Sequence, residues 1–170
     1  MSRYRPPRPP SKPYITQSGL AVLQDELSAL WRQRVDVTAA LSAAAAEGDR
    51  SENAEYIYRK KQLAGIDRRI RYLQKRIPNL NVVAAPGDPG RVFFGARVEL
   101  EAEDGKILSY RIVGADEISS DSSLGYISVD SPMAKALLGK QIDDDVDVIV
   151  AGERRSYSVL DISYDEFSPS

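Results

Sequence analysis

Apolar residues recur at alternating three- and four-residue spacing through the first half of the chain. One series runs through 19–47 and a second through 63–77, where it ends at Pro78. Spacing of this kind predicts long helices that bury one narrow seam. The first series consists of Leu20, Leu23, Leu27, Leu30, Arg34, Val37, Leu41 and Ala44, in which Arg34 is the one polar member, and the second of Leu63, Ile66, Ile70, Leu73 and Ile77.

Two such helices joined by a short turn must lie antiparallel, so we expect a coiled-coil hairpin over 14–82. Thr16 or Ser18 is expected to cap the first helix. A helix from 19 to 47 would be roughly 43 Å long at the usual rise per residue. Its last turns are rich in alanine, which keeps the helix stable and its end slender, or simply allows close helix packing.

After residue 82 the pattern changes from helical to alternating. The prolines and glycine of 83–90 indicate a linker, and Glu103-Asp104-Gly105 is a hairpin turn signal. Ser131-Pro132 should begin a short helix, 133–138, that ends at Gly139. We therefore expect an α+β protein in which a small α+β domain, 91–170, follows the hairpin. Strands are predicted at 92–100, 107–113, 126–129, 146–150 and 157–162.

Composition removes several classes of chemistry. The chain has no cysteine and no histidine, so disulfides, thiolate catalysis, a histidine base and the usual zinc sites are excluded. A metal site would have to use carboxylates, which favour a hard ion such as magnesium. Residues 1–13 are basic and rich in proline, which predicts a flexible arm and not a signal peptide. With no apolar run near the ~20 residues of a membrane span, we expect a cytoplasmic protein.

Charge is unevenly distributed between the two halves. Residues 1–87 carry 15 basic against 8 acidic residues, whereas 88–170 carry 8 against 17. The excess is densest in the second helix, where Asp67 is the only acid of 59–76. Lys61, Arg68 and Lys75 repeat every seven residues and form a basic stripe opposite the seam. An unbalanced stripe is more typical of phosphate contact than of a solvated face. The predicted RNA-binding residues are Arg59, Lys60, Lys61, Arg68, Arg71 and Lys75.

Two carboxylates stand in the hairpin tip, residues 47–56. Asp49 and Glu52 fit a capping box, with Asp49 or Ser51 as the N-cap of the second helix. They also fit a metal function, because exposed carboxylates can supply part of a magnesium shell but rarely all six ligands. In that case they would complete a site on another molecule. Tyr56 and Tyr58 follow, and either stack on a base or pack within the protein.

The second domain offers no catalytic group of residues. The acidic run 143–147 alternates with valines and reads as a turn that enters a strand. Ser131-Pro132-Met133, with Ala136 and Leu137, is either an apolar patch for a partner or ordinary core.

These features together resemble the bacterial Gre transcript-cleavage factors, and the dense basic helix favours the GreB branch over the GreA branch. Four segments carry the resemblance, which covers about 15–164. They are 48–56 (GDRSENAEY), 66–73 (IDRRIRYL), 92–96 (VFFGA) and 127–140 (ISVDSPMAKALLGK).

The resemblance implies a coiled coil followed by a domain similar to the FKBP fold. It implies a monomer that binds RNA polymerase through Ser131, Pro132 and Met133, and whose coiled coil enters the secondary channel. Asp49 and Glu52 would hold a Mg2+ shared with the polymerase active site and not bound by the isolated protein. Ser51 would position a water, and the basic residues would hold the 3′ end of backtracked RNA. The chain would activate the polymerase's own cleavage without being an enzyme itself.

One departure from the family falls in the first helix, where Val35 replaces an expected proline and should straighten it. Two other functions stay open. One is a secondary-channel regulator that does not promote cleavage, and the other is an FKBP-type isomerase or chaperone.

Overall fold

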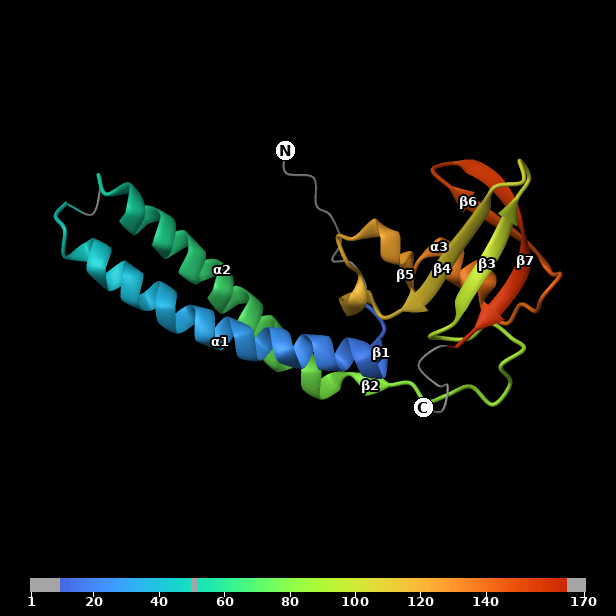
Figure 1. Cartoon of the computed structure of the whole chain (residues 1–170), viewed down its shortest axis with the longest axis horizontal. Helices are drawn as coiled ribbons and strands as arrows, with labels where there is room; N and C mark the ends of the chain where they lie inside the picture. The colour runs from blue at the N-terminus through green and yellow to red at the C-terminus, as the bar shows by residue number, and fades with distance from the viewer. Residues whose placement is uncertain (1–9, 50–51, 165–170) are drawn as a thin grey trace, which may run out of the picture. The chain divides into compact units, whose positions relative to one another are not determined.

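A computed structural model describes residues 10–49 and 52–164, which fall into two compact units (Figure 1). A helical hairpin comprises Leu20–Leu80, and a sheet unit comprises the remaining described residues. The predicted α+β class is confirmed. The helices are α1 Gln17–Ala45, α2 Ala54–Arg76 and α3 Pro132–Leu137, with 3-10 turns at Ile77–Asn79, Ala115–Glu117 and Ser122–Leu124. The strands are β1 Tyr14–Ile15, β2 Asn81–Val82, β3 Arg97–Ala102, β4 Ile107–Val113, β5 Tyr126–Ser128, β6 Asp145–Val150 and β7 Glu153–Ser163.

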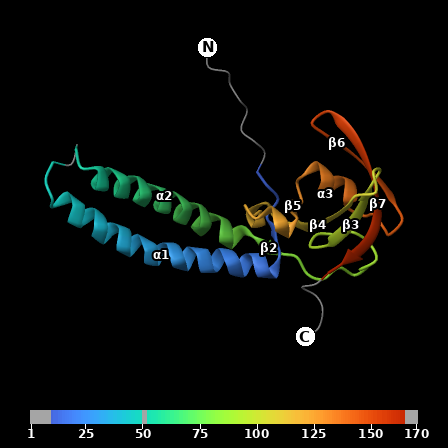
Figure 2. The same cartoon turned by 45° about the horizontal axis from the view of Figure 1, so that its top comes forward.

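In the hairpin, α1 and α2 run antiparallel and side by side (Figure 2). Val37 of α1 forms a buried cluster with Ile66 and Ile70 of α2, and all three are members of the predicted seam. Leu23 and Leu73 are buried as well. The two apolar series therefore face each other as predicted, and α1 runs unbroken through the exposed Val35.

The polar member of the seam is satisfied across the hairpin. Arg34 Nε donates to Asp67 Oδ1 at 2.7 Å, and this hydrogen bond and the attraction of the carboxylate raise the pKa of Arg34. A second pair joins the same helices, since Arg69 donates two hydrogen bonds to Glu26, at 2.6 and 3.0 Å. Paired charges at two levels favour one register of α1 against α2.

The start of α1 is fixed within the sheet unit. Thr16 Oγ1 accepts from Gly19 N at 3.0 Å, which confirms Thr16 as the N-cap. Glu117 Oε2 accepts from Thr16 N at 3.1 Å and from Gly114 N at 2.7 Å, while Glu117 Oε1 accepts from the Thr16 hydroxyl. One carboxylate thus ties the first turn of α1 to the turn after β4.

The chain segments that flank the hairpin are joined to each other. β1 and β2 pair in parallel, and Pro13 O accepts from Asn81 N at 2.7 Å. Residues 14–19 and 81–82, which sequence analysis grouped with the coiled coil, therefore belong to the sheet unit. Of the predicted arm, residues 1–9 lie outside the described residues.

The main sheet has the strand order β5-β4-β3-β7-β6. Strands β4 and β5 are parallel, and the other neighbours are antiparallel. Burial alternates along β3, where Val98 and Leu100 are buried and Glu99 is exposed. α3 lies against one face and contributes Ala134 and Leu137 to the core. The other buried core residues are Val92, Phe94, Ala96, Val98, Leu100, Ile112, Val129, Val146, Val148, Tyr157 and Val159.

Several boundaries differ from the prediction, most of them by one or two residues. β3 begins at Arg97 and not at Val92, because Gly95 has a φ of +89° and breaks the extended run that the apolar residues suggested. β7 begins earlier than predicted, after a tight turn at Ala151 and Gly152, which both have positive φ. β6 begins at Asp145, one residue before the predicted start. By contrast, β4 has its predicted bounds, and Ser131 caps α3 by accepting from Ala134 N.

The described residues contain no group of three or more His, Cys, Asp or Glu residues that could hold a metal ion. As predicted, the acidic run 143–147 is a turn that leads into a strand, β6, which begins at Asp145. None of the helices described is long and apolar enough to cross a membrane.

The contact between α1 and Glu117 predicts that alanine substitutions at two helical glycines will change the stability of the protein in opposite directions. A Cβ on Gly19 would overlap Glu117 Oε1, so Gly19→Ala must displace the carboxylate from Thr16 and Gly114. We expect a loss of about 1–3 kcal/mol in the free energy of unfolding, measured by urea denaturation followed by circular dichroism. Gly65→Ala is the control, because its Cβ would meet only Arg68 Nη2 at 3.8 Å. It should stabilise the protein by up to about 1 kcal/mol. Equal stability of the two variants would contradict this account.

Candidate functional site at the hairpin tip

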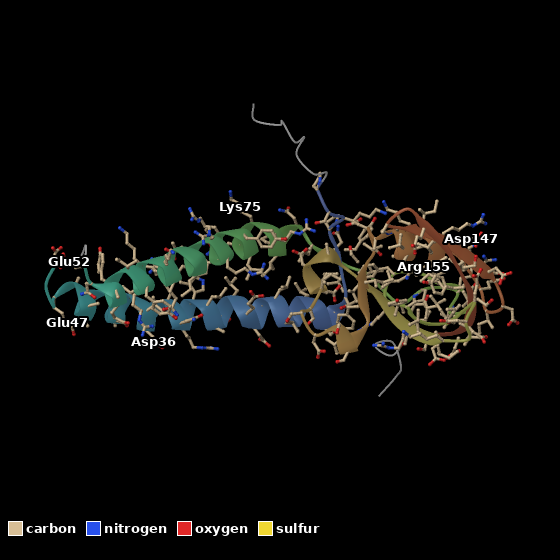
Figure 3. The ribbon with its side chains drawn as sticks, turned by 90° about the horizontal axis from the view of Figure 1, so that it is seen from above. Asp36, Glu47, Glu52, Lys75, Asp147 and Arg155 are labelled. Carbon is tan, nitrogen blue, oxygen red and sulfur yellow. The ribbon has the colours of Figure 1, made fainter. Side chains whose placement is uncertain are left out.

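The tip is built by the abrupt end of α1. The helix stops at Ala45, Glu47 N donates to Ala44 O at 3.2 Å, and Gly48 follows with a φ of +137°. Residues with a side chain rarely adopt this φ, so glycine allows the chain to turn sharply away from the helix. Asp49 and Glu52 are exposed on either side of Arg50 and Ser51, which lie outside the described residues. Figure 3 shows Glu47 and Glu52 at the same end of the hairpin.

The N-cap of α2 is Asn53, which corrects the capping-box prediction. Asn53 Oδ1 accepts from Tyr56 N at 3.0 Å, and its backbone carbonyl accepts from Ile57 N at 3.1 Å. Asp49 is therefore not the N-cap, and Glu52 precedes the cap instead of lying at N3, while Ser51 lies outside the described residues. The missed signal is an asparagine directly before Ala54 and Glu55, since asparagine ranks with aspartate and serine as an N-cap.

Asn53 also joins α2 to α1. Its Nδ2 donates at 2.7 Å to Ala44 O, a carbonyl in the last turn of α1 that also accepts from Glu47 N. The bond closes a loop over 45–52, and both Asp49 and Glu52 belong to this loop. The side-chain amide of Asn53 thus caps α2, so neither acid is needed as its N-cap.

Two carboxylates at this place suit a partial metal shell. Carboxylate oxygens are hard donors of the kind that magnesium prefers, but Mg2+ takes about six ligands. The described residues offer no third acidic or histidine neighbour in a ligating group. Asp49 and Glu52 therefore fit a metal site only if another molecule supplies the remaining ligands.

The basic stripe lies on α2 as predicted. Lys61, Arg68 and Lys75 are exposed, and among the described residues none of the three forms an ion pair; Figure 3 labels Lys75. Arg71 is exposed beside them and donates to Asp67 O at 3.3 Å. Because Asp67 pairs with Arg34 of α1, the one acid of this segment does not neutralise the stripe.

Two other predicted RNA-binding residues have local partners. Arg59 Nε lies 2.8 Å from Glu55 Oε1, and Arg59 Nη1 donates to Gln62 Oε1 at 3.0 Å. Arg59 is displaced around the helix from the stripe, at the rotational position of the seam. Lys60 is exposed, with its Nζ 6.0 Å from the ring centre of Tyr56, which is itself half-buried.

In the sheet unit, the predicted docking residues are partly structural. Ser131 caps α3, and Met133 is half-buried against the core, whereas Pro132 is exposed. Leu137, the other candidate for an apolar patch, is fully buried. Pro132 is thus the member of the docking triplet most open to a partner.

Comparison with known proteins matches both units. The GreA/GreB transcription elongation factor N-terminal model matches residues 13–82, and the GreA/GreB C-terminal model matches residues 87–164. Transcription elongation factor GreB of Xanthomonas axonopodis pv. citri is 55% identical over 167 residues, 96% of this chain and 98% of its own. The GreB of Pseudomonas aeruginosa is 54% identical over 166 residues, with the same two shares. Among solved structures, Gfh1 of Thermus thermophilus is 25% identical and covers 88% of this chain and 97% of its own, with a TM-score of 0.40.

The double role of Asn53 predicts that its two bonds can be separated. Asn53→Asp keeps an acceptor for Tyr56 N but removes the donor to Ala44 O, whereas Asn53→Ala removes both. We expect hydrogen exchange of the Tyr56 amide to remain slow in the Asp variant and to accelerate about 5-fold or more in the Ala variant, since a lost N-cap costs about 1 kcal/mol.

The Asp variant should instead show faster exchange of the last amides of α1, because the end of that helix loses its tether. Ser42→Ala is a control, since Ser42 is an exposed residue of α1 and should leave both regions unchanged. Loss of Tyr56 protection in Asn53→Asp would show that the two bonds do not act separately.

Proposed function

Because the chain belongs to the GreA/GreB family of transcription elongation factors, we propose that it stimulates cleavage of backtracked RNA within RNA polymerase. The observation that carries the proposal is the exposed pair Asp49 and Glu52 in a turn whose capping role belongs to Asn53. The pair is too small to hold a metal ion alone, which fits residues that complete a site in a partner.

The hairpin would enter the secondary channel of the polymerase with its tip foremost. The slender alanine-rich end of α1 suits a narrow passage, and the buried seam of Val37, Ile66 and Ile70 keeps the two helices together. Asp49 and Glu52 would then supply carboxylate oxygens to a Mg2+ ion that polymerase residues also hold. An ion held there would supply a coordinated water of lowered pKa and would stabilise the negative charge of the reacting phosphate. Ser51 is predicted to orient that water.

The rest of the chain would bind the RNA and the polymerase and so orient the tip. The basic stripe would hold the extruded 3′ segment of the RNA by its phosphates, with Lys60, Arg71 and Arg59 at its margins. The triplet Ser131, Pro132 and Met133 would dock a monomer on the rim of the channel. In this scheme the chain lends ligands to the polymerase's own cleavage reaction and is not an enzyme by itself.

The proposal predicts that the two tip acids can be removed without loss of binding. In a purified backtracked complex with magnesium, Asp49→Asn combined with Glu52→Gln should lower the rate of RNA cleavage by at least about 100-fold, since metal stabilisation of a transition state amounts to several kcal/mol. Polymerase affinity should stay within about twofold, because the changes preserve side-chain size.

Glu47→Gln is the matched control for this experiment. Glu47 is an exposed acid of the same tip, so its removal changes the local charge but leaves the proposed ligands in place. Cleavage should remain at the wild-type rate. Undiminished cleavage by the double variant would refute the proposal, and binding of the wild type without any cleavage would indicate a non-cleaving regulator.

A further inference from the structure

An arrangement of a tyrosine, an arginine and a carboxylate occurs twice along α2, and in the second case α1 supplies the carboxylate. Tyr58 and Tyr72 are exposed, at 58% and 43%, although the surface around them is polar. Each ring lies against a guanidinium group, with Arg59 Cζ 5.4 Å from the ring centre of Tyr58 and Arg69 Cζ 5.3 Å from that of Tyr72. These distances are within the range of cation–π contact.

Each of the two arginines is held in turn by a carboxylate. Arg59 is paired with Glu55 at 2.8 Å, and Arg69 with Glu26 at 2.6 Å. The acid, the arginine and the tyrosine therefore form a braced unit, and a ring that is already braced loses less conformational freedom when a ligand stacks on it. Two surface tyrosines with the same support at two places indicate a shared role.

The two units lie in line along one face of the helix. Tyr58 and Tyr72 are 14 residues apart, which is two heptads and about 21 Å along the axis. Gly65 is midway between them in the same column, and the nearest atom that its Cβ would meet is Arg68 Nη2 at 3.8 Å. No side chain of that residue therefore stands between the two rings.

The basic stripe runs directly beside this column. Lys61, Arg68 and Lys75 follow Tyr58, Gly65 and Tyr72 by three residues each, and residues three apart are neighbours on a helix surface. Neither column contains an acid. One column thus presents aromatic faces and the other presents cations, which is the combination that binds single-stranded nucleic acid without reading its sequence.

We propose that this face of α2 is a track for single-stranded RNA, in which Tyr58 and Tyr72 stack on bases while Lys61, Arg68 and Lys75 contact phosphates. The inference rests on the proposed function for the source of the RNA, the extruded 3′ segment. It adds that the strand is held by its bases as well as by its charge, and it assigns Arg59 and Arg69 to the support of the rings.

The test compares binding of a base-containing and an abasic strand. Fluorescence anisotropy with the full chain would use a labelled 12-nucleotide oligouridine and an abasic strand of the same length and charge. Wild type should bind the oligouridine at least about 5-fold more tightly. Tyr58→Leu and Tyr72→Leu should each reduce this preference severalfold, with unchanged affinity for the abasic strand, whereas Tyr72→Phe should retain it.

Two control variants separate stacking from charge and from general exposure. Lys75→Gln should weaken binding of both strands equally and reduce the salt dependence by about one phosphate contact. Trp31→Leu removes an exposed aromatic residue of α1 and should leave the preference unchanged. The inference fails if wild type shows no base preference, or if both leucine variants retain it. Asp49→Asn with Glu52→Gln should keep the preference, so a failure of the cleavage proposal is seen separately, in the backtracked complex.

Discussion

The tip depends on one side chain that both donates and accepts. Where two antiparallel helices meet, α1 leaves carbonyl groups unpaired and α2 leaves N–H groups unpaired. Asn53 binds one of each, through Nδ2 to Ala44 O, which also accepts from Glu47 N, and through Oδ1 to Tyr56 N. An ionised aspartate has no donor for the carbonyl, and a serine hydroxyl is too short to span both partners. The amide therefore closes the turn without either acid serving as the N-cap of α2.

Charge on the hairpin is sorted by the same pairing of helices. Arg34 interrupts the apolar seam, and Asp67 interrupts the basic run, but the two form an ion pair at 2.7 Å that neutralises both charges. Glu26 likewise takes up Arg69. Among the described residues, Lys61, Arg68 and Lys75 of the outer face form no ion pair, and Arg71 beside them donates to a backbone carbonyl. The uncompensated positive charge therefore lies along this column and its margin.

The sequence predicted the elements whose signals are local. Heptad spacing located both helices, and Ser131 with Gly139 located α3, because seam periodicity, caps and glycine turns act within a few residues. It failed where a distant partner decides. β1 and β2 are two residues long and form by pairing with each other. The capping box was wrong for a local reason, since Asn53 caps α2 by accepting from Tyr56 N. The tip acids could be predicted as candidates, and Asn53 before Ala54 and Glu55 was the signal that would have located the cap.

Different faces of the hairpin therefore have different roles, with one face packing the two helices together and the other exposed. The inner face of α2, with Ile66 and Ile70, holds it to α1, and its flank binds Glu26 through Arg69. The outer face and the tip loop contribute nothing to the buried cluster. Exposed side chains on the outer face should therefore cost the fold less to change than those of the seam. Exposed tyrosines and unpaired cations on such a face cost the fold little to change, so their presence in register over two heptads is better explained by a ligand than by packing.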